Sequence, residues 1–142
     1  MAYCDLETGA IIFYERFEGF DGSVKDRYFV VIVNSSPEVE CFTTTTQPHA
    51  ETNPRLATEF CEIADGECCL PKRCFLDFRK IHKFDDIQLS SRLRSKSVKQ
   101  LGDVPRAVLL KIRTALAGSR GVSEVDKERL LAALDQQIDA LA

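Results

Sequence analysis

Residues 27–47 read Arg-Tyr-Phe-Val-Val-Ile-Val-Asn-Ser-Ser-Pro-Glu-Val-Glu-Cys-Phe-Thr-Thr-Thr-Thr-Gln. The run 30–33 contains only β-branched residues, which is typical of a strand buried on both faces or lying in a closed barrel. Asn-Ser-Ser-Pro at 34–37 favours a turn, and residues 39–46 return as a second strand that contains Phe42 and four threonines. The stretch predicts a central β-hairpin with a cation, Arg27, at its entry and hydroxyl groups at its exit.

Further short strands and turn signals surround this hairpin. The expected strands cover residues 9–14, 59–63, 74–78 and 81–89, the last as one strand or two. Polar residues 15–26 predict a flexible loop, and the polar and basic residues 90–100 predict either a short helix or a loop. Several short strands joined by turns favour a small barrel or a highly curved sheet.

The hydrophobic period changes towards the C-terminus. Apolar residues recur at helical spacing at Val104, Val108, Leu109, Ile112 and Leu116, and again at Val125, Leu130, Leu134, Ile138 and Leu141. Ser123 followed by Asp126 is typical of a helix N-terminus. We therefore expect one domain over 1–142, with a barrel core at about 9–100 and two helices at about 104–117 and 123–141.

Composition restricts the class of protein. A chain of 142 residues that is 44% hydrophobic can bury a sizeable core. Its formal net charge of −3 excludes a uniformly basic nucleic-acid binder. Basic residues nevertheless gather at 72–83 and 92–99, so an electropositive face on an acidic protein is compatible with the sequence.

The sequence shows neither the charged-then-apolar pattern of a signal peptide nor an apolar run of about 18 residues that could span a membrane. It therefore predicts a cytoplasmic protein. Reduced thiols are then expected for the six cysteines, Cys4, Cys41, Cys61, Cys68, Cys69 and Cys74. The last four leave six, zero and four residues between them, which fits poorly with the paired spacing of a structural zinc site. His82 is expected to be an ordinary sheet histidine, and neither it nor His49 completes a recognisable cysteine-nucleophile signature. We therefore expect no metal and no cofactor.

A different group of residues suits phosphate chemistry. Lys25 and Arg27 precede the hairpin, and Thr43–Thr46, Gln47 and His49 follow it. Cleaving RNA without a metal requires a proton to leave the 2′-OH, another to reach the 5′-oxygen, and stabilisation of the charged phosphorane. Arginine suits the last task because its guanidinium binds two phosphate oxygens and stays charged. Threonine runs in strands also simply reflect β propensity, so both interpretations stay open.

The order of these pieces resembles the PemK/MazF family of toxin endoribonucleases over residues 9 to about 117. The opening strand 9–12 is followed by a glycine-containing loop that ends at Arg27 and by the strand 29–33. Phe-Thr-Thr-Thr-Thr-Gln at 42–47 is similar to the family's Thr-Thr-Gln at the end of its next strand. Later, Leu-Pro-Lys at 70–72 precedes a strand, and Leu-Gly at 101–102 leads into a helix.

The resemblance implies an SH3-like β-barrel with appended helices, commonly a homodimer. It implies metal-independent cleavage of single-stranded RNA to a 2′,3′-cyclic phosphate and a 5′-OH, with inhibition by a cognate antitoxin protein. Arg27 matches the family's catalytic arginine and Thr45 its active-site threonine. Lys25, Thr46, Gln47 and His49 are then expected to bind substrate.

Two departures from the family pattern bear on catalysis. Tyr28 follows Arg27 where the family usually has proline, and the preceding loop is Gly-Ser-Val-Lys-Asp at 22–26, so Lys25 is an alternative functional cation. Residues 119–142 extend past the resemblance. The alternative function is a catalytically inactive barrel that binds a protein or nucleic acid, and a cysteine-based zinc module is a weaker third.

Overall fold

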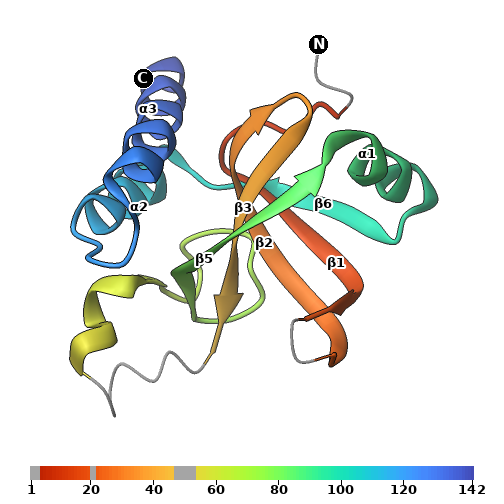
Figure 1. Ribbon diagram of the computed structural model, residues 1–142, viewed down its shortest axis with the longest axis horizontal. Coiled ribbons are helices and arrows are strands. Elements are labelled where there is room, and N and C mark those ends of the chain that lie inside the picture. Colours follow the sequence, from red (N-terminus) through yellow and green to blue (C-terminus); the bar gives the residue numbers. More distant parts are fainter. Residues whose placement is uncertain (1–3, 20–21, 47–53) are drawn as a thin grey trace.

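The computed structural model describes residues 4–19, 22–46 and 54–142. Six strands form one antiparallel sheet in the order β4-β5-β3-β2-β1-β6 (Figure 1). The strands are β1 (Ala10–Glu18), β2 (Val24–Ser35), β3 (Glu38–Thr45), β4 (Phe60–Ile63), β5 (Cys74–Asp85) and β6 (Val98–Asp103). The helices are the short 3₁₀ helix η1 (Pro54–Glu59), α1 (Asp86–Ser95), α2 (Arg106–Ala117) and α3 (Glu124–Ala140).

The sheet curls strongly enough to bring β1 towards β5, although β3 and β2 lie between them. The ring of Tyr14 on β1 stacks on Phe84 of β5 at 5.6 Å. Phe17 meets His82 at 5.7 Å in the same gap. This mostly β architecture with a highly curved sheet agrees with the fold class predicted from the sequence.

The central strands are buried from both sides. Val30 and Ile32 of β2 pack into a core with α2 and α3, whereas Phe29 and Val31 pack into a second core on the concave face of the sheet, closed by Leu89 of α1. In Figure 1, α2 and α3 accordingly lie on one side of the sheet and α1 on the other. The prediction that residues 30–33 are buried on both faces is confirmed.

Two register shifts decide which side chains face the concave side. One extra residue in β1 between the pairs Tyr14↔Arg27 and Phe17↔Lys25 turns Phe17 to the same face as Tyr14. Arg16 accommodates this bulge with a φ of 53°. The other shift lies in β5, where His82 pairs with Cys41 and Asp77 pairs with Thr43. The β5 partners are therefore five residues apart where the β3 residues are two apart, so β5 contains three extra residues.

The hairpin, the turn before Glu38 and both C-terminal helices are confirmed, and Ser123 caps α3 by accepting a hydrogen bond from Asp126 N at 3.2 Å. Three other predictions are wrong. Residues 15–26 are not a loop, because β1 continues to Glu18 and β2 begins at Val24. The strand expected at 81–89 ends at Asp85, whose side chain caps α1.

The third wrong prediction is the count of two α-helices, since the described residues form three α-helices. The helix α1 and the strand β6 occupy 90–100, where a short helix or a loop was expected. Within α1 only Asp86 and Leu89 are fully buried, so its apolar stripe is too short to show a helical period. No described helix is long and apolar enough to span a membrane.

Candidate functional site

The two residues predicted to be catalytic lie near the same end of the β2–β3 hairpin. The last paired residues there are Phe29 and Thr43. Arg27 and Thr45 each lie two residues beyond this pair, so alternation along the strands puts them on the same face of the sheet as Phe29 and Thr43. Both side chains are partly exposed, so a ligand can reach them.

The residues predicted to bind substrate are less concentrated. Lys25 lies two residues before Arg27 on the same face of β2, is exposed, and pairs with Phe17 of β1. Thr46 directly follows β3 and is exposed. Gln47 and His49 lie outside the described residues.

The strand β5 adds groups that the sequence did not single out. Asp77 pairs with Thr43, and Phe75 pairs with Thr45, so both share the face of Arg27. Arg79 binds the Asp77 carboxylate through Nε and Nη2 at 3.0 and 2.8 Å. The pairing of β5 with β3 joins residues 30 or more positions apart in the chain, which no local sequence pattern indicates.

Two arginines on this side of the sheet lie over aromatic rings. The guanidinium of Arg79 lies 5.0 Å from the ring centroid of Phe60, which pairs with Asp77 from β4. The guanidinium of Arg73 lies 5.0 Å from the ring centroid of Phe75. Both rings are partly exposed. Adjacent cationic and aromatic groups of this kind suit stacking with unpaired bases.

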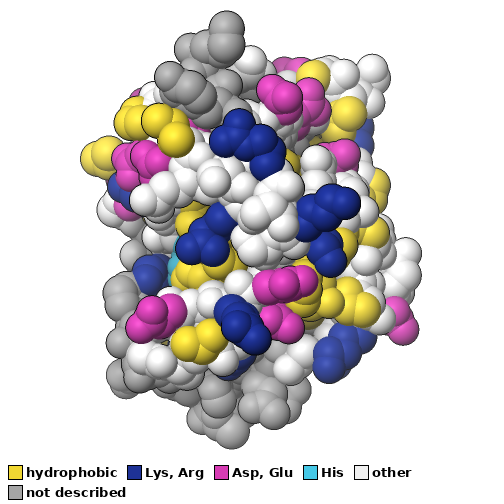
Figure 2. Space-filling view, turned by 90° about the vertical axis from the view of Figure 1, so that its right-hand side faces the viewer, with side chains coloured by type: hydrophobic (Ala, Val, Ile, Leu, Met, Phe, Trp, Pro, Cys, Tyr) yellow, Lys and Arg dark blue, Asp and Glu magenta, His cyan; other side chains and the backbone are white. Residues whose placement is uncertain are grey.

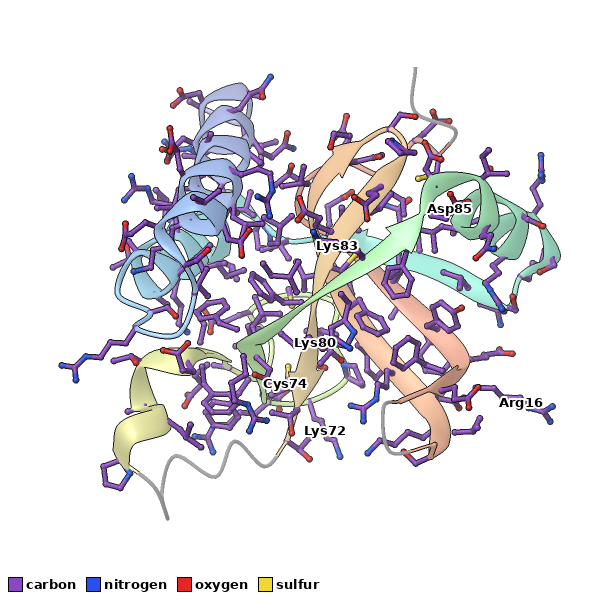
Figure 3. All side chains as sticks on the ribbon, in the orientation of Figure 1. Arg16, Lys72, Cys74, Lys80, Lys83 and Asp85 are labelled. Carbon is purple, nitrogen blue, oxygen red and sulfur yellow. The ribbon has the colours of Figure 1, made fainter. Side chains whose placement is uncertain are left out.

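His82 lies on the floor of this region, edge-on to Phe17 and Phe29 at 5.7 and 5.1 Å. Burial, followed by the charges of Lys80 and Arg27, lowers the pKa of His82 to about 4 against the opposing effect of Asp77. Burial also lowers the pKa of Lys80, which lies midway along β5 between Cys74 and Lys83 (Figure 3). The imidazole is therefore neutral at pH 7.

The cysteines do not form a reactive or metal-binding centre in the described part of the chain. Burial raises the pKa of Cys41 strongly and the pKa values of Cys61 and Cys74 to about 11, so these thiols stay protonated at neutral pH. Among residues 4–19, 22–46 and 54–142, no three histidine, cysteine or acidic side chains are placed to hold a metal ion. The sulfur of Cys69 instead packs against Gly102 of β6.

Phe42, a further aromatic beside the threonines, is fully buried and 5.0 Å from Phe78, so it belongs to the core. The surface groups that remain are Arg27 and Thr45, flanked by the Asp77–Arg79 pair, Lys80 and the rings of Phe60 and Phe75. Glu62 pairs with Phe75 on the same face and accepts a hydrogen bond from Arg73 at 2.7 Å. The cations, hydroxyls, ion-paired carboxylates and partly exposed aromatic rings of this face suit a phosphodiester with unpaired bases on either side.

Comparison with known proteins adds no independent assignment. The chain matches no protein-family model. No curated protein is significantly similar to it. The functional argument therefore rests on the geometry of this face and on the resemblance in its sequence.

Proposed function

We propose that this protein is a metal-independent endoribonuclease of the PemK/MazF type, acting on single-stranded RNA from an SH3-like barrel. The observation that carries the proposal is that Arg27 and Thr45 lie on one face at the same end of the β2–β3 hairpin, each two residues beyond the last pair, Phe29 and Thr43. These two residues are the ones that the family resemblance assigns to catalysis. Their shared face follows from strand alternation, which the resemblance did not use.

In the proposed reaction, the 2′-oxygen attacks the adjacent phosphorus and the bond from phosphorus to the 5′-oxygen breaks. Arg27 binds two non-bridging oxygens and stabilises the charge of the phosphorane. The hydroxyl of Thr45 orients the same phosphate. The products are a 2′,3′-cyclic phosphate and a free 5′-OH, and no water or metal ion is consumed.

The reaction also moves two protons. Asp77 is the carboxylate that β5 brings onto the Arg27 face, and it is our candidate to accept the 2′-OH proton. Lys80 is our candidate to protonate the leaving 5′-oxygen, because its lowered pKa makes it a better acid than an ordinary lysine. His82 is neutral and largely enclosed by rings, which suits it to shaping the floor of the site.

Substrate and partners follow from the same proposal. Bases that are not paired would stack on Phe60 and Phe75 beside Arg79 and Arg73, which favours single-stranded RNA over a duplex. A second copy of the chain and a cognate antitoxin protein are the proposed protein partners. Light scattering of the purified protein, alone and after co-expression with a neighbouring open reading frame, tests both.

The decisive experiment is cleavage of a long single-stranded RNA in excess EDTA by the wild type, Arg27→Ala and Thr45→Ala. We expect discrete fragments with 5′-OH ends from the wild type and at least about 100-fold slower cleavage by both variants. Fragments that persist equally in both variants would contradict the assignment of the site. Saturable RNA binding without any cleavage would favour the alternative, an inactive barrel that binds nucleic acid.

A further inference from the structure

A pocket of about 100 Å³ opens where the curled sheet brings β1 and β5 together and α1 covers the gap. It is lined by Tyr14, Lys83, Phe84, Asp85, Gln88, Leu89 and Arg92. Figure 2 views the molecule from the α1 side and shows lysine and arginine side chains surrounding patches of hydrophobic side chains. The proposed reaction uses none of these lining residues.

The walls of this pocket are aromatic and cationic. Tyr14 and Phe84 are stacked with an interplanar angle of 27°, and the Arg92 guanidinium lies 5.2 Å from the Tyr14 ring centroid. Another planar ring can stack on these groups without a change in their arrangement. The pocket has room for several water molecules, which is enough for about one planar ring but too little for a folded peptide segment.

The rim of the pocket is polar and has a defined hydrogen-bonding character. One carboxylate oxygen of Asp85 accepts the backbone N–H of Gln88 at 2.9 Å, which fixes the carboxylate at the start of α1 (Figure 3). Its other oxygen can accept from a ligand, and the Gln88 side chain is exposed beside it. A carboxylate selects a group that presents N–H donors at its edge.

The pocket adjoins the proposed phosphate site. Tyr14 is the direct strand partner of Arg27, so the two share a face with Cα atoms about 5 Å apart. An RNA whose scissile phosphate lies at Arg27 therefore passes the pocket with a neighbouring nucleotide. Arg92 at the rim places positive charge along the same path.

We propose that the pocket formed by Tyr14, Phe84, Asp85, Gln88 and Arg92 binds one unpaired nucleobase next to the scissile phosphate and sets the base preference there. This inference rests on the proposed endoribonuclease function. The Asp85 carboxylate favours bases with an amino group at their edge, namely cytosine, adenine and guanine. Uracil is disfavoured because two carbonyl oxygens flank its single N–H donor, and a carboxylate repels them.

Cleavage-site mapping on a randomised RNA pool tests the inference with three variants. Arg92→Ala is expected to lower kcat/KM on preferred sites about tenfold and to flatten the base preference at one position beside the cut. Asp85→Asn keeps the helix cap, because asparagine caps as well as aspartate. It is expected to raise the relative use of uracil at that position. Arg94→Ala, an exposed arginine of the same helix outside the pocket lining, is the matched control and is expected to behave as the wild type.

A second measurement separates the pocket from the nuclease. Cytidine, adenosine, guanosine and uridine 5′-monophosphates are titrated into ¹⁵N-labelled protein, and the side-chain signals of Gln88 and Arg92 are followed. Shifts induced by the amino-bearing nucleotides, with the Gln88 shift lost in Arg92→Ala, support the base site even if the wild type cleaves nothing and the proposed function falls. If the wild type cleaves RNA and its base preference is unchanged in Arg92→Ala and Asp85→Asn, the base site alone is overturned. If the wild type neither cleaves RNA nor shows nucleotide-induced shifts, the base site and the proposed function are both overturned.

Discussion

Arg129 of α3 donates two hydrogen bonds to the carboxylate of Glu40 on β3, at 2.8 and 2.6 Å, and a third to Asp126. Glu40 is only 4% exposed. Since a buried carboxylate without its cation is strongly disfavoured, this pair ties the C-terminal helix to the central hairpin. The helix that extends past the family resemblance is therefore part of the folded core.

The first prediction follows from this tie. Arg129→Ala is expected to lower the free energy of unfolding by about 2 kcal/mol, less than a fully buried pair would, because the Arg129 side chain is 36% exposed. Urea unfolding followed by circular dichroism measures the change. Arg113→Ala is the control, because its ion pair with Asp135 is exposed on both sides and its loss is expected to have a much smaller effect. Equal losses in the two variants would contradict the buried role of Glu40.

The second prediction concerns the loop between α2 and α3, which encloses the carboxylate of Glu59. Ser119 Oγ donates to Glu59 at 2.5 Å, and the backbone N–H groups of Arg120 and Gly121 donate at 2.9 and 3.2 Å. A β-carbon at Gly121 would lie 2.7 Å from Glu59 Oε1. Gly121→Ala is therefore expected to displace the carboxylate and to lower the free energy of unfolding by about 2 kcal/mol.

Gly118 provides the matched control for this substitution. It has a negative φ of −87°, which alanine also adopts, and a β-carbon there meets nothing closer than 3.6 Å. Gly118→Ala is expected to be neutral or slightly stabilising, because alanine reduces the freedom of the unfolded chain. A thermal melt in which both variants shift equally would show that the Glu59 contacts do not account for the cost.

The third prediction is a pH dependence of stability that arises from His82. Its pKa in the folded protein is about 4, below the usual 6.5, because burial and the nearby cations disfavour the charged ring. The unfolded chain therefore binds the proton first as the pH falls. Stability is fully present above about pH 6.5 and declines towards pH 4, by about 2 kcal/mol once solvent screening at this partly exposed ring is allowed for.

Proton NMR checks this directly, with the His82 signals assigned through a His82→Gln variant. We expect the ring signals to stay at their neutral positions down to about pH 5. The same variant is expected to flatten the stability profile between pH 6.5 and 4. Titration of His82 near pH 6.5 would instead mean that the ring is open to solvent and that the concave core is looser than described.

The fold could be predicted from sequence where one local pattern dominates. The continuous β-branched run 30–33 indicated the central strand because both of its faces are buried. The apolar stripes of α2 and α3 showed a clear helical period. The helix α1 gave no such stripe. The three-residue shift in β5 reverses the alternation of side chains, so no periodic reading places Lys80 or His82 on a given face.

The candidate site was predictable only in part for the same reason. Arg27 and Thr45 lie on the two strands of one hairpin, just beyond its last pair, so their order in the chain already predicts that they share this end of the hairpin. Asp77, Arg79 and Phe60 join them through the pairing of β3, β5 and β4, which depends on the long-range topology of the sheet. The pocket at Tyr14 and Phe84 depends on the curl of the sheet, which sequence alternation does not encode.

The last prediction distinguishes the two cations that the sequence left open. Arg27 is partly buried and lies at the same end of the hairpin as Thr45, whereas Lys25 is exposed and lies nearer the loop before β2. Arg27→Lys keeps the charge but loses the bidentate contact, so we expect kcat for RNA cleavage to fall about 100-fold. Lys25→Ala is expected to raise KM a few-fold and to reduce the salt dependence of binding, with kcat nearly unchanged, because it removes only long-range attraction. Steady-state kinetics at two salt concentrations measures both. Loss of kcat in Lys25→Ala, with full activity in Arg27→Lys, would transfer the catalytic role to Lys25 and would remove Arg27 from the proposed site.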